Sequence, residues 1–217
     1  MTGSAGGTGR SRAAPAGARG ADRQRRTPAD GGGTGRAGLN PERVVAEAAA
    51  LADERGIQAL SLAPLAERLG VRVPSLYKHV RGLDDLHRRL ALAGLRDLAE
   101  ALGAATVGRS GRDALLACAT AWRAYAKAHP GRYGAIQRAP DPADAELVAA
   151  ASRLTELVYA ILRGYGLDDD QTVHATRAVR SALHGFVTLE AAGGFGLPQD
   201  VDESYARLVD LLDSGLG

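Results

Sequence analysis

The 217-residue chain is poor in cysteine, in aromatic side chains and in long apolar runs. Cys118 is its only cysteine, so the chain can form neither an internal disulfide nor a cysteine zinc cluster, and a reducing cytoplasm is the expected compartment. It has no apolar run of about 18 residues, so we expect no membrane-spanning helix, and no signal peptide is expected at Met1. Aromatic residues make up 4% of the chain, whereas Ala, Leu and Arg are abundant, which favours helices over sheets.

Catalytic and cofactor-binding motifs are also lacking. The sequence has no nucleophile elbow, no P-loop and no dinucleotide fingerprint, and the three glycines at 31–33 lie in a Gly/Ala-rich stretch. Asp84 and His87 have the spacing of half a carboxylate-histidine metal site, but no second copy follows. We therefore expect a protein that is not an enzyme and binds neither a cofactor nor a metal.

Charge is unevenly distributed along the chain. Residues 1–39 hold seven Arg and two Asp, whereas residues 40–217 carry a net negative charge. The same first segment holds eleven Gly, eight Ala and a single large aliphatic residue, Leu39, so it cannot bury enough apolar surface to fold and is expected to be a disordered basic arm. Two interpretations remain open: a solvated tail without a role, or an arm whose arginines contact phosphates or a minor groove.

Helical periodicity begins abruptly at Asn40-Pro41, a good N-cap followed by a proline at the first helical position. The pattern predicts an all-α fold of about nine helices without a convincing strand. We assign residues 40–99 to a domain containing a three-helix unit and residues 100–217 to a larger helical domain. The expected helices lie near 41–55, 62–69, 74–80, 83–102, 112–127, 133–138, 145–163, 169–192 and 202–215.

Residues 61–80 contain two short helical patterns on either side of Gly70-Val71. The second pattern places a hydroxyl, a phenol, an ammonium and an imidazole close together, which is typical of a helix-turn-helix whose second helix enters a DNA major groove. The stretch from Asn40 to about Leu102 resembles the DNA-binding domain of TetR/AcrR-type transcriptional regulators. The matching residues are Ser61-Leu62, Ala66–Val71, Leu76–His79 and Leu83–Leu86.

The C-terminal part resembles the WHG subclass of that family, which is named for a Trp, a His and a Gly. Trp122 and His184-Gly185 occupy the corresponding positions. Two departures affect the helix-turn-helix. Arg72 replaces the usual Ser or Thr cap, and Val80 replaces the usual Phe, so detailed base contacts are not carried over. The resemblance implies a sequence-specific regulator, by default a repressor, that is commonly released from DNA by a small molecule.

Six residues are candidates for contacting double-stranded DNA: Ser61, Arg72, Ser75, Tyr77, Lys78 and His79. Arg72 stands at the start of the recognition helix, where it could bind a base edge or a phosphate, or remain a solvated arginine. The resemblance makes Tyr77 a phosphate contact, although it could also pack at the edge of the small core. A helical interaction protein that has lost DNA binding is the alternative function.

One recognition helix reads too little DNA, so we expect a homodimer on a near-palindromic operator. The helices at 169–192 and 202–215 are the candidate interface, with Ala178, Ala182, Gly185, Leu208 and Leu212, although the small residues could instead pack within one subunit. The fourth helix, 83–102, could act as a lever between ligand and DNA sites. Candidate ligand contacts, each also interpretable as plain core, are Trp122, Tyr125, Tyr133, Tyr159, His184 and Phe186. The sequence does not identify the effector, and a regulator without one remains possible.

Overall fold

The computed structural model describes residues 38–217, so the expected basic arm lies outside the described residues except for Gly38 and Leu39. The first helix, α1, spans Pro41–Arg55, and the Asn40 side chain accepts a hydrogen bond from the N–H of Arg43. Pro41 occupies the first turn, where its missing N–H has no helical partner. The predicted start of this helix is confirmed.

The next elements are short. A 3-10 turn, η1 (Ile57–Ala59), leads to α2 (Leu62–Leu69) and then to α3 (Val73–Leu76). Gly70 ends α2 in the left-handed conformation at φ 67°, which a side chain would disfavour. Buried residues of α1, α2, α3 and the start of the next helix form the N-terminal core, among them Val44, Leu51, Leu65, Leu76, Leu86 and Leu90.

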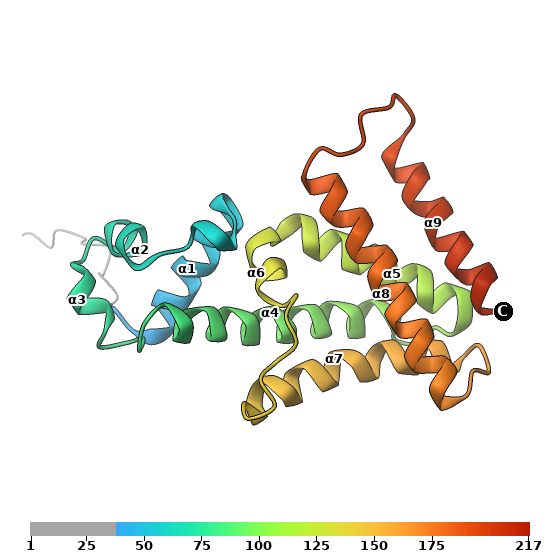
Figure 1. Ribbon diagram of the computed structural model, residues 1–217, viewed down its shortest axis with the longest axis horizontal. Helices are drawn as coiled ribbons and strands as arrows, with labels where there is room; N and C mark the ends of the chain where they lie inside the picture. The colour runs from blue at the N-terminus through green and yellow to red at the C-terminus, as the bar shows by residue number, and fades with distance from the viewer. Residues whose placement is uncertain (1–37) are drawn as a thin grey trace, which may run out of the picture. The chain divides into compact units, whose positions relative to one another are not determined.

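The longest helix, α4 (Leu83–Thr106), belongs to two cores. Leu86 and Leu90 pack in the N-terminal core. Leu95, Leu98 and Leu102 pack in the C-terminal core, the cluster of buried residues that this helix forms with the helices after it. In Figure 1 this helix runs from α1–α3 into the other helices. The predicted domain boundary between residues 99 and 100 lies within it.

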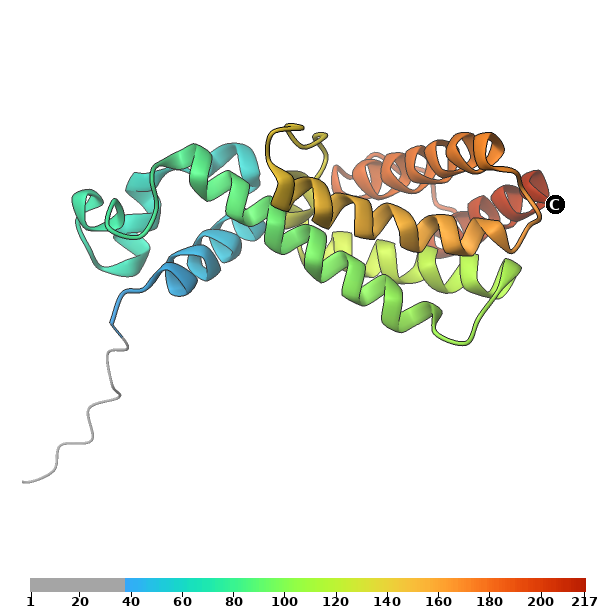
Figure 2. The same cartoon turned by 90° about the horizontal axis from the view of Figure 1, so that it is seen from below.

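Five more helices complete the described unit: α5 (Gly111–Ala128), α6 (Pro130–Ala135), α7 (Ala145–Arg163), α8 (Asp169–Ala191) and α9 (Val201–Leu216). Asp168 begins α8 with a capping box in which its side chain and that of Gln171 satisfy each other's backbone N–H groups. Both views place α2 and α3 at one end of the unit and α9 at the other (Figure 1, Figure 2).

The described residues thus contain nine α-helices and no strand, and the all-α prediction is confirmed. Some predicted bounds were wrong. The sixth helix starts at Pro130 rather than near 133, because proline takes the first helical position directly after α5. The last helix is capped by Asp200, whose carboxylate accepts from the N–H groups of Asp202 and Glu203. No helix within residues 38–217 is long and apolar enough to cross a membrane.

Candidate nucleic-acid interface and cavity

The expected recognition helix is shorter than predicted. Only Val73–Leu76 is helical, and the segment continues as turns in which the N–H groups of His79 and Val80 both bond to the carbonyl of Leu76. The residue at the cap, Arg72, makes no side-chain capping bond, and a serine or threonine there would supply one. Leu76 and Val80 are both buried, as predicted, so they anchor the segment in the N-terminal core.

The six predicted DNA contacts divide into two groups by exposure. Arg72, Tyr77 and Lys78 are exposed, and Tyr77, at 57% exposure, is not a core residue. Within residues 38–217, neither Arg72 nor Lys78 forms an ion pair or a side-chain hydrogen bond with another described residue. The other three, Ser61, Ser75 and His79, are half-buried. The first group therefore presents two cations and a phenol on the surface around α3.

Charged side chains form hydrogen bonds before and after the helix-turn-helix. Arg68 of α2 donates to Glu47 and Glu54 of α1 at 2.9 and 2.7 Å. Beyond α3, Asp85 accepts the backbone N–H of Arg81 at 2.9 Å and the guanidinium of Arg89 at 3.1 Å. Burial opposes ionisation of Asp85, but these two donors outweigh it and lower the pKa of its carboxyl.

The helix α6 packs directly against α1. Asp53 of α1 accepts the N–H groups of Gly131 and Arg132 at 2.9 and 3.0 Å, and it also pairs with the Arg132 guanidinium. Arg132 in turn reaches Asp97 of α4 at 3.0 Å. This cluster connects α1, α4 and α6. A displacement of α6 would therefore also displace α1, the helix that precedes α2.

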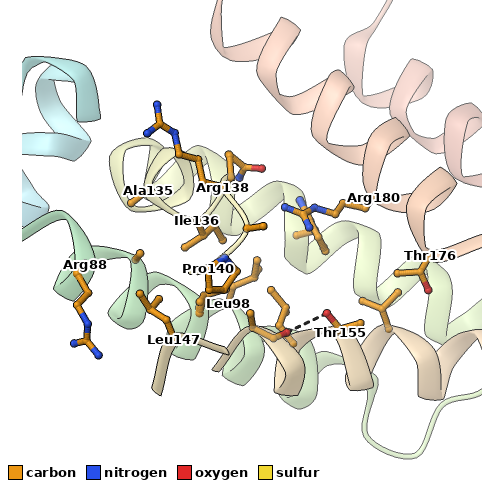
Figure 3. A pocket seen from close by; sticks show the side chains of 18 of the residues that line it. Arg88, Leu98, Ala135, Ile136, Arg138, Pro140, Leu147, Thr155, Thr176 and Arg180 are labelled. Carbon is orange, nitrogen blue, oxygen red and sulfur yellow. Dashed lines mark hydrogen bonds between the residues drawn. The ribbon is translucent and has the colours of Figure 1, made fainter. Parts of the chain in front are cut away.

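A cavity of about 410 Å³ lies between α4, α5, α6, α7 and α8. Its volume is within the range of about 300–1,000 Å³ usual for small-molecule sites. Figure 3 shows Leu98, Ala135, Ile136, Pro140 and Leu147 gathered around it, with Arg180 reaching toward them from α8. Most of the lining is apolar, including Ala91, Leu95, Leu98, Leu147, Ala151 and Leu154.

Of the six predicted ligand contacts, Trp122 lines this cavity and the other five are not among its lining residues. Trp122 is linked to two of them. Its indole N–H donates to the Tyr133 hydroxyl at 2.9 Å, and the hydroxyl lies 3.0 Å from Nδ1 of His184. The phenol oxygen accepts the indole N–H, and the phenol O–H can donate to Nδ1 when that nitrogen carries no proton. These hydrogen bonds connect Trp122, Tyr133 and His184 beside the cavity. They give the Trp and the His of the WHG pattern a structural role.

The pKa shifts of His184 and Tyr133 agree with a hydrogen bond from the Tyr133 hydroxyl to Nδ1 of His184. Burial, together with the nearby Arg180 cation, lowers the pKa of His184, and burial raises the pKa of Tyr133. A neutral imidazole is therefore available to accept the phenol proton at neutral pH. The other three candidates have different neighbours: Tyr125 donates to the carbonyl of Gly94, Phe186 packs on Phe195 and Tyr205, and Tyr159 is half-buried.

The predicted dimer residues also fall into two groups. Ala178 is exposed and Ala182 and Gly185 are half-buried on α8, and a Cβ added at Gly185 would meet nothing within 4 Å. By contrast, Leu208 and Leu212 of α9 pack against the C-terminal core of their own subunit. Sequence reasoning missed two large apolar side chains that do face outward here, Leu189 at 52% and Leu211 at 71% exposure.

It also missed polar residues of the cavity, among them His87, Thr176 and Arg180. A signal was present for the last two. Thr176 and Arg180 are one turn apart and adjoin the apolar row Val179, Leu183 and Val187, so they border the inward face of α8.

The comparisons with known proteins agree along the chain. The family described as "Bacterial regulatory proteins, tetR family" matches residues 44–90, and "Tetracyclin repressor-like, C-terminal domain" matches residues 115–212. The uncharacterized HTH-type transcriptional regulator Rv0681 of Mycobacterium tuberculosis is 38% identical over 179 residues, which are 82% of each chain. YobS of Bacillus subtilis, also described as an uncharacterized HTH-type transcriptional regulator, is 35% identical over 83% of this chain and 94% of its own.

Solved structures show the same arrangement. A protein of unknown function from Rhodococcus sp. RHA1 superposes with a TM-score of 0.69 at 26% identity, covering 83% of this chain and 96% of its own. A TetR variant of Acinetobacter baumannii in complex with minocycline gives 0.62 at 26% identity, covering 82% and 96%. Together with the helix-turn-helix and the two family matches, these likenesses show that the chain belongs to the TetR family of bacterial transcriptional regulators, which bind DNA and are not enzymes.

Proposed function

We propose that the protein is a cytoplasmic repressor that binds a near-palindromic operator as a homodimer and leaves it when a small molecule enters the cavity. The observation that carries the proposal is the position of α6. Its C-terminal residue, Ala135, lines the cavity, while Gly131 near its N-terminus is bonded to Asp53 of α1. The boundaries 40–99 and 100–217 belong to the same proposal, with α4 shared between the two parts.

The coupling needs no contact between ligand and DNA. A ligand that binds one arrangement of α4 and α6 more tightly than another shifts the population toward it. Both helices border the cavity, and both contact α1, so the shift changes where each subunit holds α3. The minocycline complex of the Acinetobacter relative supports the proposal, since a relative of this fold binds a small molecule.

The DNA-binding half of the proposal predicts a uniform loss of affinity in Lys78→Ala. A phosphate contact carries no sequence information, so the variant should bind operator and unrelated DNA more weakly by a similar factor. The slope of log affinity against log salt should fall by about one contact per subunit, which is about two in a dimer. Fluorescence anisotropy on the DNA flanking the protein's own gene, over a salt series, measures both quantities.

Arg153→Ala is the matched control, because Arg153 is an exposed cation on α7 rather than in the helix-turn-helix. It should leave affinity and slope unchanged. An unchanged slope in Lys78→Ala would remove Lys78 from the interface. Absence of binding to any fragment of a genomic pool would favour the helical interaction protein instead.

The dimer half predicts that Gly185→Arg yields a folded monomer. A Cβ added at this position meets nothing within 4 Å in its own subunit, whereas a closely packed partner helix would have no room for an arginine side chain. Analytical ultracentrifugation should show half the wild-type mass, with an unchanged helical circular-dichroism spectrum. Ala149→Arg, on the exposed face of α7, should remain a dimer. A dimeric Gly185→Arg would move the interface away from this part of α8.

A further inference from the structure

Two polar atoms in the cavity wall have no partner. Nε2 of His87 on α4 and Oγ1 of Thr176 on α8 are buried, and among the buried side-chain nitrogen and oxygen atoms of the described residues they are the two without a hydrogen-bond partner. Both residues line the same cavity. A buried polar group without a partner is destabilising, and native structures rarely keep one without a reason. A ligand that bonds to both atoms would supply the missing partners.

A cation accompanies the threonine. Arg180 follows Thr176 by one helical turn, lines the cavity, and has no ion pair or side-chain hydrogen bond with the residues that the structure describes. In Figure 3 its guanidinium points from α8 toward the lining residues of other elements, whereas Arg88 and Arg138 point away. Arg88 is also neutralised by Asp144 and Glu146 at 2.5 and 3.0 Å. Arg180 is therefore the cation available to a bound molecule.

The remaining charge in the lining is Asp141, at the loop before α7. Its carboxylate accepts the backbone N–H of Ala143 at 2.9 Å, so one of its oxygens already has a hydrogen-bond donor within the turn. The rest of the cavity is formed by apolar side chains such as Leu98, Leu147 and Leu154. A free guanidinium beside apolar side chains suits a ligand that carries one negative charge on an otherwise apolar molecule. A carboxylate fits this description, because a guanidinium binds it with two parallel hydrogen bonds.

We propose that the effector is an apolar carboxylic acid whose carboxylate is bound by the Arg180 guanidinium and the Thr176 hydroxyl. Its body lies on the leucine side chains, and a second polar group, a hydroxyl or carbonyl, meets His87 at the α4 side. The inference rests on the proposed function, in which this cavity holds the effector, and it adds the chemical class. A cationic ligand is disfavoured, because it would meet Arg180.

The chain provides its own probe for the test. Trp122 is the only tryptophan and lines the cavity, so its fluorescence reports binding without DNA. Phenylbutyrate, phenylbutyramide and phenylbutylamine share one apolar body and end in an anion, a neutral amide and a cation. The full-length protein should bind the acid roughly 10–100-fold more tightly than the amide, as expected for a charge-assisted bond, and the amine most weakly.

Arg180→Gln should remove the preference for the acid, lowering its affinity to that of the amide while leaving the amide's affinity unchanged. Thr176→Val, close in shape, should weaken the acid less. Arg177→Gln is the matched control, since Arg177 lies on the same helix, is exposed and is not in the lining. It should keep the wild-type preference.

Three results would overturn the inference: equal binding of acid and amide by the wild type, an unchanged preference in Arg180→Gln, or no change in Trp122 fluorescence with the acid at millimolar concentrations. Release of operator DNA is measured separately by anisotropy. If the acid binds with the expected preference but the DNA stays bound, effector release fails as a function while the ligand class stands. If the amide releases the DNA at the same concentrations as the acid, release stands and the ligand class fails.

Discussion

Gly131→Ala is expected to destabilise the protein by about 3 kcal/mol or more, because the added methyl group has no space. A Cβ at this position would lie 2.1 Å from the carbonyl carbon of Ala52, 2.3 Å from its oxygen and 2.6 Å from its Cβ. Two of these atoms are backbone of α1, so no side-chain rotation relieves the overlap. Relief requires α1 and α6 to separate, which would also break the bonds from Asp53 to Gly131 and Arg132.

Urea unfolding at neutral pH measures the loss. Gly103→Ala is the control, because Gly103 is inside α4 and its Cβ would make an ordinary contact, 4.0 Å from a methyl carbon of Leu157. Alanine in a helix interior is favoured over glycine by about 0.5–1 kcal/mol, so this variant should be slightly more stable than the wild type. If Gly131→Ala unfolds at the wild-type urea concentration, α6 and α1 are not in this close contact.

Gly131 also illustrates what a sequence reveals. The segment His129-Pro130-Gly131 falls between the helices expected near 112–127 and 133–138, and it is the junction of α5 and α6. The need for glycine there was not predictable, since the atoms that exclude a side chain belong to Ala52, far away along the chain. Local signals, by contrast, were sufficient for the N-cap of the first helix, because Asn40 acts through a bond to a residue three positions later.

The same distinction applies to the functional sites. The helix-turn-helix was predictable because its apolar anchors, its glycine and its exposed polar residues fall within twenty consecutive positions. The cavity was not, because five helices line it and the space depends on how they pack. Searching for aromatic residues found Trp122 but missed Arg180, since a charged residue beside an apolar row is usually a solvated one. Only packing shows which of α8's polar side chains face a cavity.

A second large effect is expected in the Arg123–Glu190 pair, which joins α5 to α8. Arg123 donates to both carboxylate oxygens of Glu190 at 2.8 and 2.7 Å, and only 13% and 16% of the two side chains are exposed. The same guanidinium reaches Asp202 of α9 at 2.7 Å and lies 4.8 Å from the centre of the Tyr205 ring. The pair therefore fixes three helices, two of which carry the proposed dimer surface.

The pair makes stability depend on pH in a defined window. The hydrogen bonds from Arg123, followed by those from Lys127, outweigh burial and lower the pKa of Glu190 from 4.5 to about 2. A carboxyl whose pKa is lower in the folded state stabilises the fold fully above its unfolded pKa, and this contribution disappears as the pH falls from 4.5 toward 2. Allowing for partial solvent screening, we expect the contribution to be about 2 kcal/mol.

Glu190→Gln should therefore be about 2 kcal/mol less stable than the wild type at neutral pH, and the difference should shrink steadily as the pH is lowered through that window. Urea unfolding at a series of pH values measures it, and other carboxyl groups cancel because both proteins share them. Glu203→Gln, in an exposed pair with Arg207 on α9, should change the neutral-pH stability by less than about 0.5 kcal/mol. A difference between Glu190→Gln and the wild type that stays constant down to pH 2 would mean that the Glu190 side chain acts by packing and not by charge.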